Sequence, residues 1–173
     1  MIIFLVKGPK LMLRLNLGCG DYPIKGWTNI DLVQLPGVDV VADVCKLPYD
    51  DNSVDEIYAG HILEHISIRE TNSTLKEWHR VLKPQGRITV TCPDFAWVCR
   101  SYLNGTLTAR EASEAYLHVE FDRHFHRAVF DIADLTIDLL NAGFVDVKTV
   151  DGKKCKMLTA QVPWQIIVTG IKL

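Results

Sequence analysis

The sequence predicts an α/β fold with a mostly parallel sheet, and two observations support this prediction. Short apolar runs, several of them closed by glycine or aspartate, alternate along the chain with segments of helical spacing. The 173 residues are 48% hydrophobic and 23% charged, which is ordinary for a globular protein and excludes a disordered chain. At about 150 residues per domain, we expect a single domain.

The predicted strands are runs of apolar and β-branched residues. They cover residues 11–17, 27–32, 38–42, 54–59, 87–91, 144–150 and 162–173. The first run ends in a glycine-rich turn, and the second and third end at Asp31 and Asp43. Because the carboxyl ends of parallel strands share one edge of a sheet, these residues are expected to gather there.

The predicted helices follow apolar residues at helical spacing. One covers residues 67–82 and is stopped by Pro84-Gln85-Gly86. Two more cover 95–103 and 109–119. A last helix begins after Asp131, a good N-cap residue, and ends at Asn141 with Gly143 just beyond.

Two connections between the first strands are too short for a full helix. Six residues separate Gly20 from Trp27, and five separate Leu32 from Val38. A parallel crossover normally takes a dozen or more residues and carries a helix. We therefore expect one poorly covered sheet face, sheltered by the 95–119 segment, by the N-terminal arm or by a second subunit in a homodimer.

Charge and cysteine content narrow the function classes. The net charge is −2, which argues against nucleic acid as the main partner. Five scattered cysteines without a Cys-x-x-Cys pair fit free thiols in a reducing cytoplasm better than a zinc finger or a disulfide framework. No apolar run approaches the roughly 20 residues that cross a bilayer, and the apolar N-terminal stretch does not fit a signal peptide. We expect a cytoplasmic protein without membrane insertion.

The strongest chemical signal is the turn Gly18-Cys19-Gly20 after the first strand, followed by two strand-end acids. Glycines let a ligand approach the backbone closely at the carboxyl end of a strand. A dinucleotide fingerprint would need a glycine at residue 23, which is Pro23. Asp31 can accept hydrogen bonds from ribose hydroxyls and Asp43 from an adenine amine. Each acid has a plainer interpretation as a solvated loop carboxylate or a helix cap.

Several motifs follow one another in an order that is typical of a known family. They are Leu15-Asn-Leu-Gly-Cys-Gly20, Gly26-Trp-Thr-Asn-Ile-Asp31, Val41-Ala-Asp-Val44, Ser53-Val-Asp-Glu-Ile-Tyr58, Leu63-Glu-His65, Trp78-His-Arg-Val-Leu-Lys-Pro-Gln-Gly-Arg87 and Leu139-Leu-Asn-Ala-Gly-Phe144. In these motifs the chain resembles the class I S-adenosylmethionine (SAM)-dependent methyltransferases. It looks closest to a compact branch that is often associated with cell-surface glycan biosynthesis.

The resemblance spans about residues 11–150 and implies a fold and a domain layout. The fold is a Rossmann-like sheet, mostly parallel with an antiparallel last strand, in which the first helices are shortened or missing. The whole chain, 1–173, would be one methyltransferase domain. Its core would comprise 11–94 and 131–173, with a helical insertion or lid at 95–130.

The resemblance also implies SAM as the cofactor and places its amino-acid portion and methyl group. Gly18 and Gly20 would lie against the amino-acid portion, and Asn16 and Cys19 flank that loop. Gly60, together with His61, would line the methyl-donor end.

The adenosine portion of SAM would lie beside the next two strand ends. Asp31 would hold the ribose, and Leu32 would pack near the adenine. Asp43 would accept from the adenine amine, and the Val44 amide would face a ring nitrogen.

The methyl acceptor is expected to be a small molecule or a sugar, and an oxygen acceptor must lose a proton. The candidate catalytic residues are His61 and Asp94, which follow strand ends, and His126 from the insertion, with His65 as a further candidate. His118, His124 and His126 form a cluster that lines the acceptor pocket, lies in a solvated loop or supplies a metal ligand.

Two other functions stay open at this point. The short first connection fits a SAM-binding scaffold or regulatory subunit without catalysis. His61-Ile-Leu-Glu64-His65 fits the H-x-x-E-H pattern of a zinc metallopeptidase, with Glu70 or Glu77 as a third ligand. That pattern must lie within a helix, whereas His61 directly follows a predicted strand. We assign no metal ligand outside this alternative.

Overall fold

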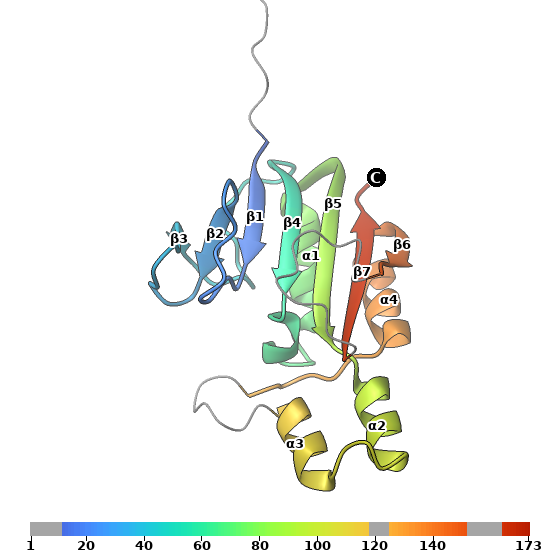
Figure 1. Cartoon of the computed structure of the whole chain (residues 1–173). Coiled ribbons are helices and arrows are strands. Elements are labelled where there is room, and N and C mark those ends of the chain that lie inside the picture. The colour runs from blue at the N-terminus through green and yellow to red at the C-terminus, as the bar shows by residue number, and fades with distance from the viewer. Residues whose placement is uncertain (1–11, 118–124, 152–163) are drawn as a thin grey trace, which may run out of the picture.

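A seven-stranded sheet forms the centre of the computed structural model, which describes residues 12–117, 125–151 and 164–173 (Figure 1). The strand order is β3-β2-β1-β4-β5-β7-β6. Strand β7 runs antiparallel to both of its neighbours, and the other pairings are parallel. The predicted α/β class and the antiparallel last strand are therefore confirmed.

The strands and helices follow the predicted order. The strands are β1 (Arg14–Leu17), β2 (Thr28–Asp31), β3 (Val40–Val41), β4 (Val54–Gly60), β5 (Leu82–Pro93), β6 (Val145–Thr149) and β7 (Gln165–Ile171). The helices are the 3-10 helix η1 (Leu63–His65), α1 (Thr71–Val81), α2 (Phe95–Leu103), α3 (Ala109–Leu117) and α4 (Ile132–Asn141). None of these helices combines the length and the hydropathy that a membrane crossing needs.

Two boundaries differ clearly from the prediction, since α1 begins at Thr71 rather than at residue 67 and β5 begins before residue 87. Strand β5 begins at Leu82 and runs through Pro84, where the sequence indicated only the end of a helix. Tertiary pairing explains the difference, because Lys172 N–H donates to Gly86 O and Gln85 N–H donates to Lys172 O. Helix α4 begins after Asp131 as predicted, because the Asp131 side chain caps it by accepting the Asp134 N–H at 2.9 Å.

The main hydrophobic core lies between the sheet and two helices on the same face. Helices α1 and α4 lie side by side behind the sheet in Figure 1. Alternate residues of the central strands reach this core together with the largest buried side chains of the helices and loops. They include Leu15, Leu17, Ile57, Ala59, Ile88, Val90, Leu75, Trp78, Leu135, Leu139 and Phe144.

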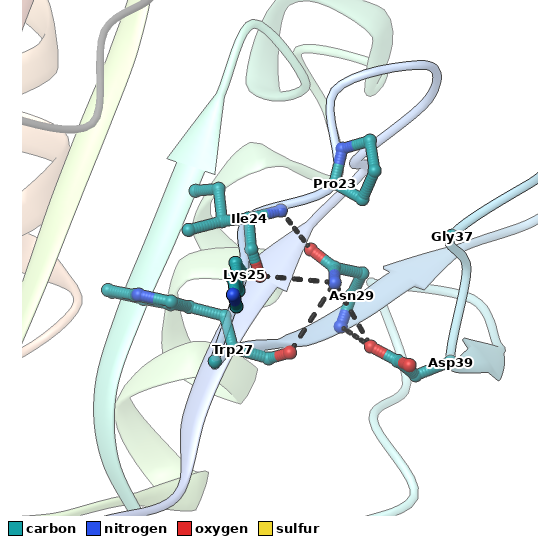
Figure 2. A pocket seen from close by; sticks show the side chains of 8 residues that line it. Pro23, Ile24, Lys25, Trp27, Asn29, Gly37 and Asp39 are labelled. Carbon is teal, nitrogen blue, oxygen red and sulfur yellow. Dashed lines mark hydrogen bonds between the residues drawn. The ribbon is translucent and has the colours of Figure 1, made fainter.

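Polar side chains alternate with these core residues along the central strands. The buried ones are Asn16, Asn29, Tyr58, Thr89 and Thr91. The connections 18–27 and 32–39 contain no helix, as expected from their length, and the longer connection 42–53 contains none either. Asn29 holds the first connection instead, because its side chain accepts the Ile24 N–H at 2.7 Å and donates to Trp27 O and to Asp39 Oδ2 (Figure 2). A shallow cavity of about 320 Å³ lies beside this network.

The prediction that the 95–119 segment shelters the poorly covered sheet face is wrong. Figure 1 shows α2 and α3 beyond the carboxyl ends of β4 and β5 rather than across a sheet face. Asp94 N–H donates to Trp164 O at 2.7 Å and Phe95 N–H donates to Phe130 O at 3.0 Å, which directs the chain away from the sheet after β5. The N-terminal arm lies outside the described residues, and the second subunit stays a prediction.

Candidate methyl-transfer site

A hydrogen bond joins the glycine loop after β1 to the acid at the end of β2. Gly20 N–H donates to Asp31 Oδ2 at 2.9 Å, and Val33 N–H donates to Asp31 Oδ1 at 3.0 Å. A carboxylate has about four acceptor sites, so Asp31 retains capacity for two further donors. The two strongest sequence signals therefore meet at one point.

The two glycines of this loop have different roles. Both adopt positive φ, 62° at Gly18 and 47° at Gly20, a conformation that favours glycine. A Cβ added to Gly20 would meet nothing within 4 Å, whereas one added to Gly18 would lie 2.6 Å from Ile62 Cδ1. Gly20 thus borders space where a ligand can approach the backbone. Gly18 allows Ile62 to pack on the loop.

Asn16 and Cys19 support the loop from beneath. The Asn16 side chain is 2% exposed and donates to Tyr22 O and to Asn29 Oδ1. Burial, reinforced by the charge of Asp31, raises the pKa of Cys19 to about 11. Both side chains are committed to the interior, so their contribution to a bound cofactor would be indirect.

The ends of β2 and β3 form a platform of one apolar and two acidic side chains. Leu32, directly after Asp31, is 70% exposed. Ala42 N–H donates to Asp31 O at 2.9 Å, which keeps the following Asp43 at the same edge. Asp43 is exposed and accepts the Cys45 N–H at 2.8 Å. Val44 is fixed from behind, because its carbonyl accepts Trp78 Nε1–H at 2.9 Å.

His61 lies just past β4 and is held on both sides of its ring. Its φ is 53°, a left-handed conformation that is uncommon for a residue other than glycine. Nδ1 lies 3.0 Å from Glu64 Oε1, and Nε2 lies 3.0 Å from Gln165 Oε1. The Trp164 ring meets the imidazole edge-on at 5.7 Å.

These contacts favour a protonated His61. Burial lowers its pKa, but the hydrogen bond and the charge of Glu64 outweigh burial, so the net pKa is raised. An imidazolium donates from both nitrogens, which matches the two oxygens that face them. In this geometry His61 offers no free lone pair and acts better as a positioning group than as a proton acceptor.

Glu64, His65 and His126 form a second cluster beside His61. Arg127 N–H and Ala128 N–H both donate to Glu64 O, at 2.7 and 3.1 Å, and bring the distant His126 against η1. One ligand atom from each of the three side chains lies within 4.8 Å of the other two. His61 precedes a 3-10 helix instead of lying within an α-helix, so the helical arrangement of a zinc metallopeptidase is not formed.

Asp94 completes this edge at the start of α2. Its side chain is buried, and no hydrogen-bond partner for Oδ1 is found among the described residues. Oδ2 lies 3.4 Å from Arg100 Nη2. A buried carboxylate oxygen without a partner calls for an explanation, and a substrate donor would provide one.

Trp164 and Gln165 were not predicted from the sequence, and Glu64 was given no role outside the family motif and the peptidase alternative. No local pattern marks Trp164 or Gln165, because antiparallel pairing of β7 with β5 alone brings them to His61. His118 and His124 lie outside the described residues.

The chain is similar to known methyltransferases. Residues 27–90 match a family described as a methyltransferase domain. The ubiquinone/menaquinone biosynthesis C-methyltransferase UbiE of Desulfotalea psychrophila is 32% identical over 139 residues, covering 73% of this chain and 52% of that protein. The chain thus spans about half the length of this relative.

Solved structures share the fold. A SAM-dependent methyltransferase from Methanosarcina mazei aligns with a TM-score of 0.65 at 19% identity, covering 95% of this chain and 94% of that chain. The 1,6-didemethyltoxoflavin-N1-methyltransferase of Burkholderia thailandensis, with S-adenosylhomocysteine bound, aligns with a TM-score of 0.59 at 18% identity, covering 92% and 70%. Residues 27–90 of the chain therefore match a methyltransferase domain, and the chain shares the fold of these solved methyltransferases. SAM is the cofactor that the domain match and these structures support.

The residues of this methyltransferase domain fit the adenosine portion of SAM. Asp31 has acceptor capacity for ribose hydroxyls, Leu32 offers an exposed apolar side chain to a ring, and Asp43 presents a carboxylate at the same edge. The open space beside Gly20 leaves the loop backbone accessible. The methyltransferase domain lacks a helix between β1 and β2, so no helix N-terminus faces the amino-acid portion there.

Proposed function

We propose that the chain binds SAM across the ends of β1, β2 and β3 and transfers its methyl group to a hydroxyl of a small molecule or sugar. The hydrogen bond from Gly20 N–H to Asp31 Oδ2 is the observation that carries this proposal. It joins the loop for the amino-acid portion to the acid for the ribose. The ends of β4 and β5, with His61 and Asp94, then form the acceptor side of the same edge.

The chain mainly has to position the acceptor and accept its proton. SAM supplies a methyl group that is already activated by the sulfonium, so its leaving group needs no acid. Holding the acceptor in line can contribute on the order of 7–11 kcal/mol. We assign Asp94 Oδ1 to accept the hydrogen bond of the acceptor hydroxyl, because this oxygen is buried and has no partner among the described residues. His61, fixed by Glu64 and Gln165, orients the acceptor, and His126 stays a further candidate.

The acceptor class and the lid belong to the same proposal. Trp164 is 37% exposed and lies beside His61, so an aromatic ring and a carboxylate flank the acceptor side. Such a pair suits a polar ring compound such as a sugar, in keeping with the glycan-biosynthesis branch. We further propose that 95–130 forms a lid over this edge, because α2 and α3 lie beyond it (Figure 1).

A SAM-binding scaffold without catalysis is the second candidate. The missing helix between β1 and β2 favours it, since a helix N-terminus would otherwise stabilise the carboxylate of SAM. A scaffold would bind the cofactor and its demethylated product without turnover on any acceptor.

Titration calorimetry with S-adenosylhomocysteine tests the proposed site. Asp31→Ala removes hydrogen bonds to a charged acceptor, each contributing about 1.5–3 kcal/mol, so affinity should fall at least about 100-fold. Asp50→Ala, which removes an equally negative but exposed carboxylate, is the matched control and should bind as the wild type does. Wild-type protein that binds no S-adenosylhomocysteine, or an Asp31→Ala variant that binds it unchanged, would refute the site. Binding without product formation across a panel of hydroxyl acceptors would favour the scaffold.

A further inference from the structure

We infer that Glu64, His65 and His126 form a binding site for one divalent transition-metal ion, such as Zn²⁺ or Mn²⁺. Two imidazoles and one carboxylate are a donor set that first-row divalent metals accept, with positions left open for other oxygen ligands. The zinc alternative suggested by the sequence combines His61 with His65, whereas this cluster combines Glu64 and His65 with His126. The cluster forms only when the chain near residue 126 folds back onto η1.

The carboxylate of Glu64 is the strongest reason for a cation. Its residue is 1% exposed, and Oε2 has no hydrogen-bond partner within the described ranges. Oε1 is occupied by the His61 imidazole at 3.0 Å. One oxygen is therefore held by an outer partner, and the other is left for a metal. Ligating carboxylates and histidines commonly have such outer hydrogen bonds.

The three ligand positions are set by the fold. Glu64 and His65 lie in η1, which follows directly on β4. Arg127 N–H and Ala128 N–H donate to Glu64 O, and the buried Ala128 and Phe130 anchor the strand-like segment that carries His126. The His65 and His126 rings meet edge-on with centroids 4.9 Å apart.

The distances require only a small closure. The three ligand atoms lie within 4.8 Å of one another, whereas ligands about 2.1 Å from a tetrahedral Zn²⁺ lie roughly 3.4 Å apart. Movements of about 1 Å per side chain, within the reach of side-chain rotation, would bring them to that spacing.

The surrounding charges also favour a cation. Asp94, a second buried acid, lies at the same edge. Among the described residues, His61 pairs with Glu64 and the largely exposed Arg100 pairs with Asp94. A divalent ion would add to the compensation that these two groups give to the buried acids.

The role of the ion rests on the proposed function, whereas its binding does not. A metal ion lowers the pKa of a bound hydroxyl and orients it. The acceptor hydroxyl would release its proton to Asp94 or solvent. Its oxygen would form the new C–O bond while the methyl–sulfur bond breaks and leaves its electron pair on sulfur. This reasoning points to an oxygen acceptor that can reach the ion.

Metal binding to the full chain, stripped by chelator and dialysed, tests the inference. We expect one equivalent of Zn²⁺ per chain by calorimetry and by elemental mass spectrometry. Glu64→Gln and His126→Gln should each weaken binding by more than about 100-fold, because loss of even an outer partner costs 10–100-fold. His79→Gln is the matched control, since it removes a half-buried histidine on α1 that packs on Phe144 and leaves the cluster intact.

Circular dichroism and S-adenosylhomocysteine binding on the same samples separate the outcomes. Folded wild-type chain without stoichiometric Zn²⁺ or Mn²⁺ would overturn the metal site. Equal binding by the wild type and both ligand variants would also overturn it, because the ion would then sit on other histidines or cysteines. If Glu64→Gln does not fold, His126→Gln alone decides. Metal binding without S-adenosylhomocysteine binding would retain the metal site and refute the proposed function, and the reverse result would do the opposite.

Discussion

The contact between Trp78 and Val44 is expected to couple fold stability to cofactor binding. Trp78 is fully buried in α1, and its indole N–H donates to Val44 O at 2.9 Å. Trp78→Phe leaves this buried carbonyl without its donor, which costs about 1–3 kcal/mol. The smaller ring leaves a void worth about 1–2 kcal/mol more. We expect the free energy of unfolding to fall by about 2–5 kcal/mol.

Urea unfolding followed by far-ultraviolet circular dichroism measures this change. With a slope of about 1–3 kcal/mol per molar urea, the midpoint should fall by roughly 1–2 M. The same variant should bind S-adenosylhomocysteine more weakly, because the turn at Asp43 and Val44 loses its support from α1. Phe144→Leu, a buried change against His79, should destabilise the protein without altering that affinity. A Trp78→Phe variant less than about 0.5 kcal/mol destabilised would refute the reasoning.

Two further predictions concern stability. The hydrogen bond from Arg80 lowers the pKa of Glu77 below its ordinary 4.5. The ionised Glu77 side chain therefore stabilises the folded chain above about pH 4.5, and this stabilisation is lost as the pH falls through the lowered pKa. Acid unfolding should therefore be less steep in Glu77→Gln than in the wild type, and identical acid profiles would contradict this. Asp131→Ala removes the N-cap of α4 and should cost about 0.5–2 kcal/mol by urea unfolding, whereas Asp131→Asn should restore most of that loss.

Local sequence signals predicted the sheet class, which the structure confirms, and the residues that we propose for the cofactor. Glycine, aspartate and apolar runs are local signals, because a tight turn, a strand end and a strand each depend on neighbouring residues. Gly20 and Asp31 could therefore be predicted, and the structure joins them by one hydrogen bond. The short connections after β1 and β2 could be read from residue counts alone.

The residues that we propose for the acceptor side are brought together only by long-range contacts. Gln165 meets His61 across 104 positions of sequence, and His126 meets Glu64 through backbone bonds of the residues that follow it. Neither contact can be seen as a local pattern in the sequence, because strand pairing and the folding back of a distant segment create these contacts. The buried polar residues of the second sheet face likewise depend on pairing, because Asn16 needs Asn29 from the adjacent strand. Features that depend on neighbouring residues could therefore be predicted from the sequence, whereas features that depend on long-range contacts could not.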